Sequence, residues 1–177
     1  MDMFFSAKRQ TLAQFMEVYD RQRLNEVHGG SPVIFDAMAN QSPQDRYEIV
    51  KFLVGEGAEL TSTNAEKETL FHVLFSRPKL DIGQTVELTK LLIDAGADIN
   101  QPDAKNRMAI QHLISQPKLT DEALASLYDI IFQSCALELN TKNDWGYTPI
   151  ELAQKFPYRA ELLKRMTAWG AQEGGRL

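Results

Sequence analysis

The chain has 177 residues, of which 44% are hydrophobic and 24% charged, a composition typical of folded proteins and not of disordered ones. Nineteen lysines and arginines face 24 aspartates and glutamates, and the net charge of −5 argues against a general nucleic-acid-binding surface. A single cysteine excludes an intrachain disulfide, and no segment resembles a signal peptide or a membrane span. We therefore expect a cytoplasmic protein that does not contact membranes.

The first 27 residues predict a helical cap. Apolar side chains keep helical spacing at Leu12, Phe15, Met16 and Tyr19. A helix here would cover the open apolar face of the unit that comes next, as the end of a repeat array requires. We expect Phe4 and Phe5 to lie beneath this helix.

A helix-ending phrase then recurs along the chain. FLVGEGAEL (52–60) is repeated 39 residues later as LLIDAGADIN (91–100), again as ALELN (136–140), and in its shortest form as Gly170-Ala171. Glycine after a periodic apolar segment supplies the left-handed residue that ends many helices. We therefore expect each copy to end one structural unit, and residues 172–177 (QEGGRL) to fray beyond the last helix.

Each unit contains two helical segments. The first segments align as TLFHVL (69–74), MAIQHL (108–113) and TPIELA (148–153), with SPVI (31–34) as a looser copy. The second segments show apolar residues at i, i+3, i+4 and i+7, namely Leu88, Leu91, Leu92 and Ala95, then Leu124, Leu127, Tyr128 and Ile131. A last helix around Leu162, Leu163, Met166 and Trp169 closes the other end. Two short helices cannot bury their apolar faces alone, so the units must stack.

These motifs resemble ankyrin repeats, in which a turn, a T-P-L-H-x-A helix, a second helix and G-A-D-x-N succeed one another. NDWGYTPIELA, LLIDAGADIN and TLFHVL carry the likeness. It implies an all-α ankyrin-repeat solenoid of stacked helix-turn-helix units joined by hairpin-like loops. About four repeats would occupy residues 28–63, 64–102, 103–142 and 143–177, forming one continuous domain with the capping region 1–27.

The sequence departs from that family's 33-residue period because the joins between the two helices are long. The extra residues fall in SRPKLDIGQ (76–84) and SQPKLTDEA (115–123). Ser42 and Asp81 are expected N-caps of second helices, and Asp81 with Gln84 resembles a capping box. The repeated Pro-Lys-Leu, which includes Lys79 and Lys118, is interpreted as a structural turn; a recognition ridge is the alternative.

No catalytic or metal-binding pattern is visible, and we expect no enzyme activity, cofactor or metal. The resemblance gives His72 a structural role, hydrogen bonding between repeats. His28 is expected to be solvated. His112 has no second ligand four residues away, so contact with a partner is the hypothesis for it, on the concave face. Cys135 is interpreted as a small hydrophobic residue and not as a nucleophile.

The resemblance places partner contacts at the loop tips and on the adjoining faces of the first helices. The candidate partner-binding residues are Glu66, Glu68, Lys105, Arg107, His112, Asp144, Trp145 and Tyr147. Tryptophan and tyrosine bury much area with few torsions and are frequent at binding hot spots. The alternatives are that Trp145 folds over its own repeat or the previous tip, and that Glu66 and Glu68 pair with Lys105 and Arg107.

The expected function is non-enzymatic binding of another protein through a rigid concave surface and its tips. A narrower possibility is a dedicated inhibitor or immunity-type protein that neutralises one toxin or enzyme. Nucleic-acid binding would require Lys79, Lys105, Arg107 and Lys118 to share one face, and enzyme activity would require converging titratable groups. A small-molecule ligand is not expected. The partner's identity cannot be deduced from the sequence.

Overall fold

The computed structural model describes residues 2–173, and this part of the chain is all-helical, as predicted. It contains no strand, only one isolated bridge between His28 and Ser31, and no helix long and apolar enough to cross a bilayer. The predicted fraying of residues 172–177 concerns a segment of which only the backbone of 172 and 173 is described, and that backbone is helical. The ten α-helices are α1 (Met3–Arg9), α2 (Leu12–Met16), α3 (Val33–Met38), α4 (Pro43–Gly55), α5 (Leu70–Phe75), α6 (Ile82–Asp94), α7 (Ala109–Ile114), α8 (Asp121–Ser134), α9 (Pro149–Gln154) and α10 (Ala160–Glu173).

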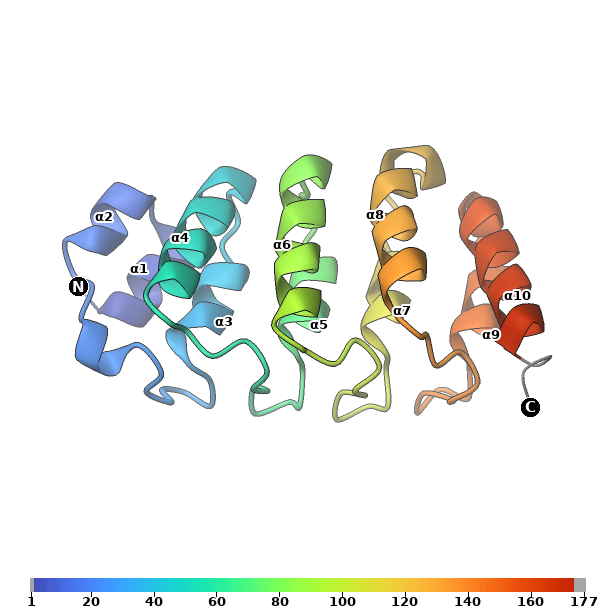
Figure 1. Ribbon diagram of the computed structural model, residues 1–177, viewed down its shortest axis with the longest axis horizontal. Coiled ribbons are helices and arrows are strands. Elements are labelled where there is room, and N and C mark those ends of the chain that lie inside the picture. Colours follow the sequence, from blue (N-terminus) through green and yellow to red (C-terminus); the bar gives the residue numbers. More distant parts are fainter. Residues whose placement is uncertain (1, 174–177) are drawn as a thin grey trace.

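The helices form five pairs arranged in a row (Figure 1). The odd-numbered helices pack each against the next, α1 on α3 and so on to α9, and the even-numbered helices do the same from α2 to α10. We call these the inner and outer layers. The loops that join one pair to the next lie together along one edge of the row, at the opposite end from the joins within a pair (Figure 1). One continuous apolar core runs between the layers from Met3 to Met166.

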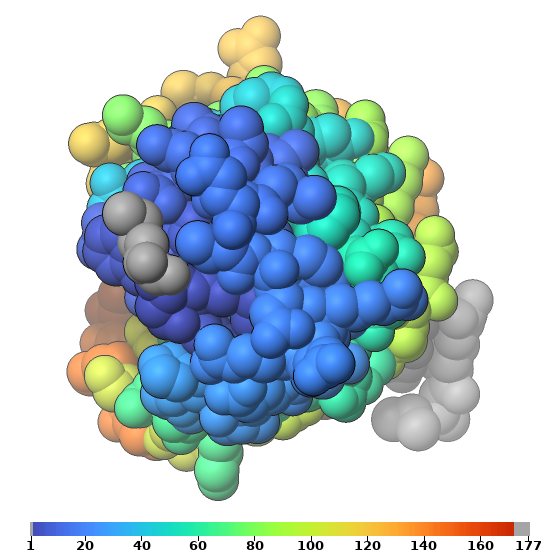
Figure 2. All heavy atoms as spheres, turned by 90° about the vertical axis from the view of Figure 1, so that its left-hand side faces the viewer, coloured from blue at the N-terminus to red at the C-terminus, as the bar shows by residue number. Residues whose placement is uncertain are grey.

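The N-terminal region is a full helix pair and not a single capping helix, which corrects the prediction. α1 contributes Phe4 and Ala7 to the core, whereas Phe5 is 53% exposed and does not lie beneath the cap. The exposed ring of His28 stacks on Phe4 with 4.5 Å between ring centres, so His28 is not simply solvated. Figure 2 looks onto this end, where residues of the first pair and the loop after it cover the face.

The ends of the helices obey the predicted chemistry with two corrections. Gly57 and Gly96 have φ of +96° and +79°, the left-handed conformation that ends α4 and α6. Gly170 instead lies inside α10, which corrects the prediction that it ends a helix. A glycine within a helix lowers stability by only ~1 kcal/mol, and no further described helix pair draws the chain away here. Asp81 caps α6 by accepting the Gln84 N–H at 2.9 Å, but the Gln84 side chain donates to Gln44 and does not complete a capping box.

The long joins are held by buried guanidinium and amide groups. Arg159 is fully buried, and its guanidinium donates to the carbonyls of Ile114, Gln116 and Leu119 in the preceding join. Arg46 bonds the carbonyl of Lys79 at 3.2 Å in the same way. These bonds use the backbone of both Pro-Lys-Leu segments, while the side chains of Lys79 and Lys118 stay exposed. The joins therefore serve as structural turns.

Candidate functional site

The three tips between the last four helix pairs share one hydrogen-bonded design. In each, a side-chain oxygen accepts the backbone N–H groups two and four residues later at 2.8–3.1 Å. The accepting residues are Asn64, Asp103 and Asn143. The same residues also donate their own N–H to the carbonyl four residues on, which closes a tight hairpin. The side chains between these points are thus presented from a rigid backbone.

Neighbouring tips are bonded to each other. The Ala104 N–H donates to the Glu66 carbonyl at 2.8 Å, and the Asp144 N–H donates to the Lys105 carbonyl at 3.1 Å. The Asn106 side chain adds a bond to the Asp144 carboxylate at 2.7 Å. The tips therefore form one continuous ribbon along the edge of the row.

A second ladder runs through the first turn of the inner helices. His72, Gln111 and Glu151 occupy equivalent positions, and each accepts the backbone N–H of the residue that precedes its helix. His72 Nδ1 is the acceptor, so its Nε2 carries the proton and donates to the Arg107 carbonyl at 2.9 Å. Gln111 Nε2 donates likewise to the Tyr147 carbonyl. His72 thus links neighbouring units, as the resemblance implied.

The predicted charge pairing between tips is half correct. Arg107 bonds Asp103 with a closest distance of 2.6 Å and reaches Glu68 at 3.8 Å. Burial raises the pKa of Asp103, but hydrogen bonds from Arg107 and Lys105 outweigh it and hold that pKa below its usual range. Glu66 and Lys105 form no ion pair within the described residues; Glu66 acts instead through its backbone carbonyl.

A pocket of about 310 Å³ opens between α7, α9 and the last tip. It is lined by Arg107, Gln111, His112, Ser115, Asn143, Trp145, Tyr147 and Leu152. Four of the eight predicted contact residues, namely Arg107, His112, Trp145 and Tyr147, therefore meet in one place. The other four, Glu66, Glu68, Lys105 and Asp144, lie on the tips and do not line this pocket.

Trp145 forms the exposed wall of the pocket. Its side chain is 57% exposed, and Lys105 Nζ and Arg107 Cζ of the previous tip lie 6.0 and 5.8 Å from the ring centre. The ring therefore does contact the previous tip, as the alternative proposed, yet more than half of it faces solvent. Tyr147 is half-buried, with Lys155 Nζ 4.4 Å from its ring centre.

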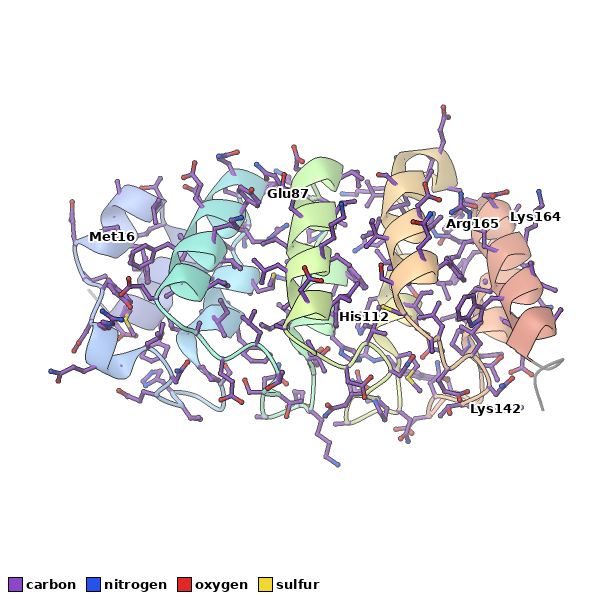
Figure 3. The ribbon with its side chains drawn as sticks, viewed as in Figure 1. Met16, Glu87, His112, Lys142, Lys164 and Arg165 are labelled. Carbon is purple, nitrogen blue, oxygen red and sulfur yellow. The ribbon has the colours of Figure 1, made fainter. Side chains whose placement is uncertain are left out.

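His112 lies on α7 in the inner layer (Figure 3) and faces several charged groups. Its ring centre is 5.6 Å from that of His72, and its buried Nε2 has no hydrogen-bond partner among the described residues. Burial, together with the nearby charges of Arg107 and His72, lowers the pKa of His112 to about 4. The imidazole is therefore neutral near pH 7.

Among the described residues, one group of possible metal ligands adjoins the pocket. One ligand atom from each of Glu68, Asp103 and His112 lies within 4.8 Å of the others. However, the Arg107 guanidinium already bonds Asp103 and reaches Glu68, and Asp103 also accepts two backbone N–H groups. Arg107 thus supplies the positive charge that these carboxylates require, and a metal would have to displace it. Elsewhere, burial raises the pKa of the Cys135 thiol, with Asp98 adding to the effect, which opposes a nucleophilic role.

Sequence reasoning missed Gln111, Ser115, Asn143 and Leu152 as pocket residues. Gln111 and Asn143 had a usable signal, because they repeat the register positions of His72 and Asn64. Ser115 and Leu152 had none, since their exposure depends on how far apart two neighbouring inner helices sit.

No protein-family model and no curated protein matches the chain. Among solved structures, it is similar to the crystal structure of a functionally unknown protein from Leptotrichia buccalis C-1013-b, with 26% identity and a TM-score of 0.86. The match covers 98% of this chain and 94% of the other. The two proteins therefore share the fold along nearly their whole length.

Proposed function

We propose that this chain is an ankyrin-type repeat protein that binds another protein through the pocket beside Trp145 and the ribbon of tips. One observation carries the proposal: a tryptophan that is 57% exposed stands at the mouth of a pocket on a rigid scaffold. Tryptophan and tyrosine are frequent among binding hot spots, and aromatic anchors seated in pockets dominate the binding energy of many interfaces.

The chemistry of the pocket favours binding over catalysis. Its polar side chains are largely committed to the backbone: Gln111 spans Met108 and Tyr147, and Asn143 holds the tip. His112 has no hydrogen-bonded nucleophile or orienting carboxylate among the described residues. Ordered side chains of this kind lose little entropy when a partner arrives, which favours affinity.

The direct test is affinity capture with the purified chain and a variant carrying Trp145→Ala and Tyr147→Ala. Phe5→Ala is the matched control, because Phe5 is 53% exposed but lies at the opposite end of the row. We expect a partner that is kept by the wild type and Phe5→Ala and lost by the double variant. Retention by all three proteins would move recognition away from this pocket.

Stoichiometry separates a scaffold from the narrower alternative. A single partner in equimolar amount, whose own activity is blocked by the wild-type chain, would support a dedicated inhibitor. Several partners with undiminished activities would support a scaffold. The measurement is the activity of the captured partner with and without the added chain.

A further inference from the structure

The pocket beside Trp145 has an apolar wall sized for one large side chain. Trp145, Tyr147 and Leu152 supply that wall. The volume of about 310 Å³ lies at the lower end of the ~300–1,000 Å³ range of ligand pockets. An aromatic or large aliphatic side chain fits this space, and it would stack on the solvent-exposed ring of Trp145.

The polar groups of the pocket that have no hydrogen-bond partner among the described residues are donors. The acceptor oxygens of Gln111 and Asn143 are already bonded to backbone N–H groups. In contrast, Arg107 Nη1 and Asn143 Nδ2 have no acceptor among the described residues, since Arg107 uses Nε and Nη2 for its carboxylate partners. An incoming group that offers oxygen acceptors is therefore complementary, and one that offers only donors is not.

Positive charge stands beside two rings of the pocket, although neither lysine lines the pocket itself. Lys105 and Lys155 approach the rings of Trp145 and Tyr147, and neither forms an ion pair within the described residues. By contrast, the nearby carboxylates of Asp103 and Glu151 are engaged by Arg107 and Lys142. A chain with a net charge of −5 thus presents available cations where its most exposed tryptophan stands.

From these contacts we infer that the pocket binds an acidic segment of a partner protein, in which an aromatic or large aliphatic side chain is flanked by aspartate or glutamate. The apolar side chain enters between Trp145 and Leu152. Its flanking carboxylates meet Lys105, Lys155 and the free Arg107 Nη1. This inference rests on the proposed function and specifies the chemistry of the partner.

The test is selection of a displayed random peptide library against the intact chain, with calorimetry on synthesised winners. We expect the winners to combine one aromatic or large aliphatic residue with at least two acidic residues. Trp145→Ala should weaken their binding by about 30-fold, the effect of losing a hot-spot aromatic. Phe5→Ala should leave it unchanged.

Charge reversal isolates the electrostatic part. Lys155→Glu should weaken the winning peptides by about three- to tenfold and reduce the dependence of their affinity on salt. Lys118→Glu, on an exposed join at the opposite end of the helices, is the matched control and should have no effect. Winners rich in lysine or arginine, or winners unaffected by both Trp145→Ala and Lys155→Glu, would overturn the inference.

The outcomes also separate this inference from the function on which it rests. Uncharged apolar winners that still require Trp145 would refute the acidic segment and retain the pocket as a binding site. Failure to select any peptide that depends on Trp145 would overturn the inference. If the affinity-captured partner is then also kept by the Trp145→Ala and Tyr147→Ala variant, the proposed site fails with it.

Discussion

Acid should destabilise this protein through His112, a buried imidazole that is neutral in the folded chain. The pKa of His112 falls from its ordinary value of 6.5 to about 4 in the folded chain, because burial disfavours the imidazolium and Arg107 and His72 add repulsion. Asp103 acts in the opposite sense, and the charge of Arg77 adds a smaller repulsion. Between these pKa values the unfolded chain binds more protons than the folded one. The free energy of unfolding therefore decreases as the pH falls from about 6.5 towards 4.

The size of the effect can be worked out from the shift. A change of 2.5 pKa units integrates to roughly 2 kcal/mol of lost stability between pH 7 and pH 5. His112 is only partly exposed, but it borders an open pocket. Solvent screening there reduces the expected loss of stability to about 1–2 kcal/mol. The groups whose carboxyl pKa is lowered, such as Asp103 and Glu151, lose their contribution only below that window.

Urea unfolding monitored by circular dichroism near pH 7 and near pH 5 measures this loss. His112→Gln keeps a polar side chain without a titrating ring, so the variant should lose about 1–2 kcal/mol less than the wild type over the same interval. The difference between the two losses of unfolding free energy removes the contributions of other groups. These include His72, whose pKa is also lowered by burial, and Asp36, whose pKa is raised by burial. Equal losses in both proteins would refute the desolvated placement of His112.

Three further variants, one of them with a matched control, test the packing and the site. Leu92→Ala removes a side chain that is 0% exposed and should cost ~2–5 kcal/mol in urea unfolding; a loss under ~1 kcal/mol would contradict the repeat register. Arg159→Met leaves the carbonyls of the preceding join without donors and should cost ~3 kcal/mol, whereas Lys142→Met, which breaks an exposed pair, should cost under ~1 kcal/mol. The double variant Trp145→Ala and Tyr147→Ala should shift the melting temperature by only a few degrees, and a collapse of the thermal transition would make those rings part of the core.

Much of the helical architecture could be predicted because each unit states its local rules in sequence. These rules are local: they include periodic apolar residues, N-caps such as Ser42 and glycines such as Gly96. Each acts over about one turn of helix, so it can be recognised from the sequence alone. α1 was missed because its seven residues carry two adjacent phenylalanines, and local sequence does not tell which of them, Phe4 or Phe5, faces the stack. The prediction that Gly170 ends a helix was wrong because it, too, depends on packing. A glycine ends a helix only where the packing of the next segment draws the chain away.

The candidate site could be predicted only as a set of positions on a shared edge. Register alignment brought Trp145, Tyr147 and Arg107 to the tips, and the pocket indeed includes them. It could not show that Arg107 turns back to Asp103, four residues earlier in its own tip, or that Leu152 of the next inner helix lines the same pocket. Those facts depend on the separation of units and on competition among several carboxylates for one guanidinium.

The ladder through His72, Gln111 and Glu151 bears on how such an array can grow. Histidine and glutamine each accept the backbone N–H that precedes their helix and donate to a carbonyl of the next tip, so either residue fits an internal unit. Glutamate at 151 only accepts, because an ionised carboxylate has no proton to donate. If the unit that precedes residue 143 were duplicated, the copy would also carry a glutamine N–H that can donate to the tip after it. A tip carbonyl placed against Glu151 would meet a carboxylate where it requires an N–H, so this side chain cannot continue the ladder of side-chain hydrogen bonds.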